Sequence, residues 1–84
     1  MSLEEANTKY EQALQREDVA EKRLLLYRSL EEVLAFLEKD SVRGLDGFDG
    51  VLYKASQDFL LASSTMEKED KMEKILGHVE RRYS

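Results

Sequence analysis

The sequence predicts an all-α protein, a compact antiparallel bundle of four helices with a long second helix as its spine. Three observations support this fold class. The 84 residues include no proline and only four glycines. Charged residues make up 37% of the chain. Apolar residues recur every three or four positions. Sheet proteins need turn residues more often. We expect a single domain over residues 1–84, with three helices instead of four if one of the breaks described below is absent.

The first helix is predicted over residues 3–16. Ser2 and Glu5 have the spacing of a capping box, in which two side chains satisfy free backbone N–H groups at a helix start. The residues that follow form one narrow stripe: Leu3, Ala6, Tyr10, Ala13 and Leu14. Two alanines on this stripe should let the helix lie close to its neighbour.

Residues 18–40 predict one long amphipathic helix. Asp18 and Glu21 again have capping-box spacing. The apolar positions form a seam with two flanks: Val19, Leu26, Leu30, Val33 and Leu37 in the seam, Tyr27 and Leu34 on one flank, Leu25 and Phe36 on the other. This arc covers roughly half of the circumference, more than the ~100° stripe of a surface helix, so we expect contact with at least two other helices. Because no glycine or proline precedes Asp18, one continuous helix from residue 3 to residue 40 is the alternative.

Residues 41–50 form the predicted loop, since they hold three of the four glycines, and Gly44 is expected to end the long helix. The third helix is predicted over residues 50–63, with Asp49 as its N-cap. Its inward side comprises Phe48, Val51, Leu52, Ala55, Phe59 and Ala62.

The fourth helix is predicted over residues 65–82, with Ser64 and Glu67 as its capping pair. Its seam comprises Met72, Ile75, Leu76, Val79 and Tyr83. If the third and fourth helices were one, Glu69 and Glu73 would fall in the apolar seam, which favours a turn at the serines. We expect the charged residues of this helix to form a solvated face.

Composition excludes several classes of function. The absence of cysteine excludes disulfides and thiolate metal sites, and a net charge of −5 opposes binding to nucleic acid. No apolar run approaches the ~20 residues of a membrane span, and the acidic start of the chain is unlike a signal peptide, so we expect a cytoplasmic protein.

No cluster of residues points to catalysis, a cofactor or a metal. Asp46 and Asp49 lie among glycines but lack the ligand spacing of a calcium loop. His78 is the single histidine and is expected at the surface. The sequence lacks a nucleophile motif and a phosphate-binding loop. We therefore expect a protein that is not an enzyme and has no cofactor or metal site.

The tripeptide Leu26-Tyr27-Arg28 resembles the signature of the LYR-motif family, small helical mitochondrial proteins that assist respiratory-complex and iron–sulfur assembly. The resemblance covers three residues of 84. That family is typically basic and carries the tripeptide near its N-terminus, whereas this chain is acidic and places a predicted helix first. In size and bundle shape the chain is also similar to MIT domains, which bind helical tails of ESCRT proteins, and to the immunity proteins that neutralise pediocin-like bacteriocins.

Surplus apolar residues give the functional prediction. Leu24 points away from the apolar arc of its helix, and Tyr53 and Leu60 mark a second stripe roughly opposite the core side of theirs. Either the fourth helix covers this stripe, or the stripe is a binding surface. We predict a non-catalytic module that binds a protein partner, such as an amphipathic helix, or self-associates through Leu24, Tyr53 and Leu60. The alternative is a small acidic inhibitor, similar to the immunity proteins, that neutralises a cationic target.

Overall fold

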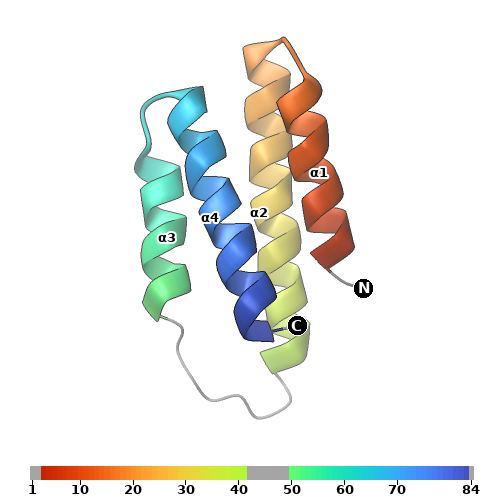
Figure 1. Ribbon diagram of the computed structural model, residues 1–84, viewed down its shortest axis with the longest axis vertical. Coiled ribbons are helices and arrows are strands. Elements are labelled where there is room, and N and C mark those ends of the chain that lie inside the picture. The colour runs from red at the N-terminus through yellow and green to blue at the C-terminus, as the bar shows by residue number, and fades with distance from the viewer. Residues whose placement is uncertain (1–2, 42–49, 84) are drawn as a thin grey trace.

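The computed structural model describes residues 3–41 and 50–83, and within these ranges the chain forms four helices and no strands. They are α1 (Leu3–Gln15), α2 (Val19–Ser41), α3 (Gly50–Leu61) and α4 (Thr65–Tyr83). Consecutive helices run in opposite directions (Figure 1). The predicted all-α class, the four helices and the long second helix, here 23 residues, are confirmed. The alternatives with one continuous helix over residues 3–40, or with only three helices, are wrong.

Short polar side chains cap the starts of α2 and α4, at the positions that the spacing of the capping pairs predicted. Asp18 Oδ1 accepts the N–H of Ala20 at 3.1 Å. At the second break Ser64 Oγ accepts the N–H of Glu67 at 3.1 Å, and Glu67 Oε1 accepts the N–H of Ser63 at 3.2 Å. These bonds satisfy N–H groups that a helix start leaves free, so the helices separate without glycine or proline.

Other predicted helix signals lie outside the described residues. These are Ser2, Gly44, Phe48 and Asp49.

The helices form a flattened bundle that measures 41 × 24 × 17 Å. The closest pairs are α1 with α2, α3 with α4 and α2 with α4, and α1 also touches α4. In Figure 1 the helix α4 lies between α3 and α2. Within the described part of the chain α2 and α3 approach each other at few points, so the side of α3 that faces α2 is only partly covered.

The core contains most of the predicted seam residues. The buried apolar side chains are Ala6, Ala13, Leu26, Leu30, Val33, Leu52, Phe59, Met72, Ile75, Leu76 and Val79. Leu3, Tyr10, Leu25, Phe36, Leu37 and Ala55 are half-buried against them.

Five residues that were predicted to belong to the core or its flanks are exposed instead: Leu14, Val19, Tyr27, Leu34 and Val51. Leu14 and Val19 flank the turn between α1 and α2 at the end of the bundle, where no further helix covers them. Val51 is exposed because α3 has one close neighbour, α4, which covers a narrow strip of its surface.

Candidate protein-binding surface

Tyr53 and Leu60, two of the predicted binding residues, are solvent-exposed in the folded chain. Their exposed fractions are 53% and 51%. One side of α3 faces α4, since Asp58 and Ala62 line a shallow depression together with Glu67 of α4. Leu60 is two residues from Asp58 and therefore lies about 160° around the helix from it. The Tyr53–Leu60 stripe thus lies on the side of α3 away from this depression. Phe59, the neighbour of Leu60 in the chain, contacts α2 through its ring.

The surface of α2 that faces α3 carries a matching stripe, formed by Tyr27 and Leu34. The Tyr27 ring meets the Phe59 ring of α3 edge-on, with 5.3 Å between centroids and 75° between planes. Leu34 lies seven residues, or two turns, further along the same side of α2. Their exposed fractions are 37% and 46%. Both were predicted as a flank of the core, so their place in a candidate site was missed.

These two stripes make up what we call the α2–α3 face, which comprises Tyr27, Leu34, Tyr53 and Leu60. It holds two large exposed apolar side chains from each of two helices. Four such side chains exceed the single exposed leucines that are normal on protein surfaces.

Lys68 of α4 lies beneath one end of the α2–α3 face and is buried, although the charged residues of α4 were predicted to be solvated. Its Nζ donates to the carbonyl oxygens of Phe59 at 3.0 Å and Leu60 at 3.3 Å. The same atom lies 5.3 Å from the Tyr27 ring centroid and 5.0 Å from that of Phe59. The last carbonyls of a helix lack partners and carry partial negative charge. A buried ammonium therefore joins α2, α3 and α4 at this level.

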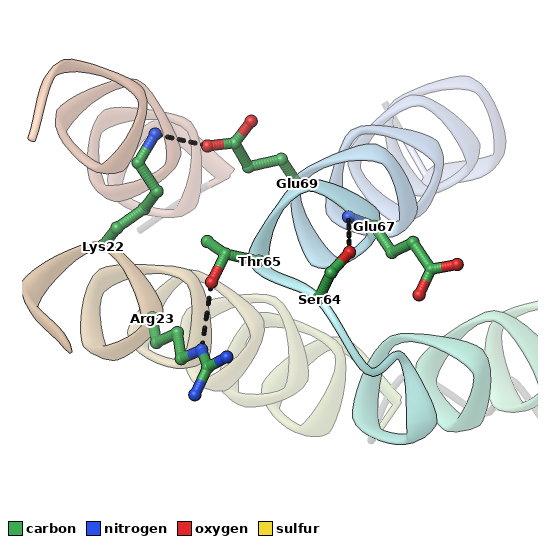
Figure 2. A network of polar contacts seen from close by, with 6 residues as sticks. All are labelled: Lys22, Arg23, Ser64, Thr65, Glu67 and Glu69. Atoms are coloured by element: carbon green, nitrogen blue, oxygen red, sulfur yellow. Dashed lines mark hydrogen bonds and ion pairs between the residues drawn. The ribbon is translucent and has the colours of Figure 1, made fainter. Parts of the chain in front are cut away.

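Two polar contacts hold the start of α2 against the start of α4 (Figure 2). Lys22 forms an ion pair with Glu69, with 2.5 Å between Nζ and Oε2, and both side chains are about four-fifths buried. Arg23 Nε donates to Thr65 Oγ1 at 3.0 Å. Tyr27 follows one turn after Arg23, so these contacts fix the part of α2 from which Tyr27 reaches α3.

Leu24, the third predicted binding residue, lies on a different helix and is 53% exposed. It lines an open depression of about 360 Å³ together with Arg16, Glu21 and Leu25, beside the turn between α1 and α2. The structure therefore brings Tyr53 and Leu60 together with Tyr27 and Leu34, and places Leu24 to one side of them.

A short repeat in the sequence marks the α2–α3 face. Residues 27–34 read YRSLEEVL and residues 53–60 read YKASQDFL. The octets share their first and last residues and carry similar residues at most positions between. In both, the tyrosine and the final leucine are exposed, while the residue before the tyrosine and the seventh residue of the octet are buried. Aligning the octets would have identified Tyr27 and Leu34 from sequence.

An acidic group lies on another side of the molecule, where α1 meets α4. Burial raises the pKa of Tyr10, and the nearby carboxylates of Glu73, Glu69 and Asp70 raise it further, because each disfavours the phenolate anion. Three carboxylates therefore lie near this half-buried tyrosine, of which Glu69 is paired with Lys22 and Asp70 with Lys74.

The described residues contain no group of three or more histidine, aspartate or glutamate side chains placed to hold a metal ion. His78 is half-buried in α4. None of the helices in residues 3–41 and 50–83 combines the length and the apolar character that crossing a bilayer requires.

Comparison with protein families, with curated proteins and with solved structures finds no match to this chain.

Proposed function

We propose that this chain is a non-catalytic protein-interaction module that binds through the α2–α3 face. One observation supports the proposal: two helices carry four large apolar side chains that remain 37% to 53% exposed. Binding would remove this surface from water, which is the main favourable term in protein association.

The spacing of the α2–α3 face suits a helix as the bound element. Within each stripe the two apolar residues are seven positions apart, or about 10.5 Å along the axis. A helix with apolar residues at positions i and i+7 repeats at the same distance, so its side chains could alternate with the tyrosines and leucines of the face. The bound helix would belong to another protein or to a second copy of the chain.

The double variant Tyr53→Glu/Leu60→Glu tests the proposal. It places two carboxylates on the face but leaves the core unchanged, so circular dichroism and urea unfolding should show a folded bundle. We expect the immobilised variant to lose any protein that the unaltered chain captures from a lysate of its cell of origin, and to lose self-association. The matched control is Val51→Glu/Met66→Glu, because both residues are exposed, lie outside the face and receive the same charge.

The proposal is wrong if the double variant binds as well as the control. Unfolding of the double variant, with the control still folded, would show instead that Tyr53 and Leu60 support the core.

A second candidate, a small acidic inhibitor of a cationic target, has support from the net charge of −5 and from the carboxylates of Asp70 and Glu73 near Tyr10. Salt separates the two candidates. Binding through the acidic side should weaken steeply between about 50 mM and about 500 mM salt, since exposed charges are screened. Binding through the α2–α3 face should persist.

A further inference from the structure

We infer that the occupant of the α2–α3 face is a second copy of this chain, with α2 of each copy lying against α3 of the other. The inference rests on the proposed function, because it uses the same face, and it adds the identity of the partner and the geometry of the pair.

The two octets run antiparallel and in register. Lys68 Nζ lies over the Tyr27 ring and also bonds the carbonyl of Leu60, so Tyr27 and Leu60 lie at the same level. From there α2 and α3 run in opposite directions (Figure 1). Leu34 comes seven residues after Tyr27, and Tyr53 comes seven residues before Leu60. Both therefore lie about 10.5 Å toward the other end of the bundle, and each level holds one tyrosine and one leucine.

This antiparallel arrangement of the two octets is self-complementary. A two-fold axis parallel to the helices preserves the levels and brings α2 of one copy opposite α3 of the other. Tyr27 then meets Leu60 of the second copy, and Leu34 meets its Tyr53. Each contact occurs twice, as a two-fold interface requires. The result is a four-helix arrangement with two core layers, each made of two tyrosines and two leucines, in which neighbouring helices are antiparallel.

Charge favours one of two possible two-fold axes. Four residues after its tyrosine, α2 carries Glu31 and α3 carries Gln57, and both are exposed. The axis parallel to the helices sets Glu31 opposite Gln57 of the second copy. The amide of Gln57 donates one N–H to Tyr53 Oη at 2.8 Å, and its second N–H can donate to a carboxylate. An axis perpendicular to the helices would set Glu31 opposite Glu31. Facing like charges oppose association, so the parallel axis is favoured.

The face is small, so the pair should be weak. Two stripes of two turns each imply an interface below the roughly 1,200–2,000 Å² of stable complexes. We expect a dissociation constant on the order of 0.1 mM.

Sedimentation equilibrium of the full chain, between about 20 µM and about 2 mM, tests the inference. We expect a monomer–dimer equilibrium that Tyr53→Glu/Leu60→Glu abolishes. Gln57→Lys should tighten the dimer about two- to five-fold, and Gln57→Glu should weaken it by a similar factor, since each changes a partly exposed pair with Glu31. The matched control Gln12→Lys makes the same charge change on an exposed part of α1 and corrects for the lower net charge.

Each result decides the inference. A chain that remains monomeric throughout overturns it, while the proposed function stands if the α2–α3 face still captures another protein. A dimer that survives Tyr53→Glu/Leu60→Glu shows that copies pair elsewhere. If Gln57→Lys weakens the dimer, or changes its stability no more than the Gln12→Lys control does, the two-fold axis is not parallel to the helices.

Discussion

Lys68 is a buried cation held by the end of a helix. Its ammonium donates to the carbonyl oxygens of Phe59 and Leu60, which belong to the last turn of α3, and it also lies over two aromatic rings. The carbonyl oxygen of Phe59 also accepts the N–H of Ala62 at 3.3 Å, so Lys68 adds a charged donor where a helix end offers few N–H partners. The lysine therefore anchors the end of α3 and supports the aromatic contact between Tyr27 and Phe59.

Replacing Lys68 with methionine should destabilise the fold by about 1–3 kcal/mol, because the apolar stem is kept while the two carbonyls lose their donor. Urea unfolding measures the change. The matched control is Lys74→Met, which removes an exposed lysine paired with Asp70 at 3.6 Å and should change stability by less than about 0.5 kcal/mol. Equal effects of the two substitutions would show that the contacts of Lys68 add nothing.

The burial of two polar residues could not be predicted from the sequence. Lys68 and Ser29 occupy helical positions where hydropathy gives no reason for burial, and each is buried because a backbone carbonyl of another helix accepts its hydrogen bond. Such a partner becomes visible only when the helices are placed. Val19 and Leu14 show the converse, since apolar periodicity does not tell whether a neighbouring helix extends far enough to cover a residue.

The helices themselves were predictable because residues close to each helix start mark where it begins. Asp18 and Ser64 each satisfy a free N–H group of the helix that follows them, so spacing to the next acidic residue was enough to place both breaks. Periodicity then identified the buried side of α4 correctly. The ends of α2 and α3 nearest the loop depend on residues 42–49, where the predicted signals stay untested.

The closest helix pair, α1 with α2, depends on small residues. Ala6 and Ala13 are fully buried, and Ser29 Oγ of α2 donates to the carbonyl oxygen of Ala6 at 2.7 Å. A side-chain bond to the backbone of another helix requires the two helices to lie close together. The two alanines predicted to permit this approach have no exposed surface.

Replacing Ala13 with leucine should therefore cost about 1–3 kcal/mol, since three added carbon atoms must push α1 away from α2. The change would be measured by urea unfolding, with Ala20→Leu as the matched control because Ala20 is exposed on α2. If the two substitutions have the same effect, the α1–α2 contact tolerates a larger side chain and the close approach is not required.

In the assembled bundle, the arrangement of the helices determines which apolar faces remain exposed to solvent. The broad arc of α2 predicted at least two neighbours, and α1 and α4 are those neighbours. The sequence did not show that α3 would meet α2 mainly through one ring contact, and this leaves Tyr27 and Leu34 exposed. The stripe of Tyr53 and Leu60 was identified as surplus from sequence, but its counterpart on α2 depends on how the bundle is assembled.

The contact between the first and last helices should make the bundle sensitive to alkali through Tyr10. Its pKa is raised above the usual 10.0 by burial and then by Glu73, Glu69 and Asp70. The unfolded chain therefore releases this proton at lower pH than the folded chain. The stability that the neutral phenol contributes is complete below about pH 10 and is lost as the pH rises toward the folded pKa. The variant Tyr10→Phe cannot ionise here, so it should lose less stability between about pH 9 and about pH 11.

The urea midpoints of the unaltered chain and of Tyr10→Phe, measured across this pH range, give the difference in stability loss. The same two proteins compared at pH 7 show how much stability the loss of the hydroxyl itself costs. The remaining tyrosines are common to both proteins and cancel in the comparison. Parallel alkaline curves would show that α1 and α4 do not bury Tyr10 beside the three carboxylates, and that the acidic side is fully open to solvent.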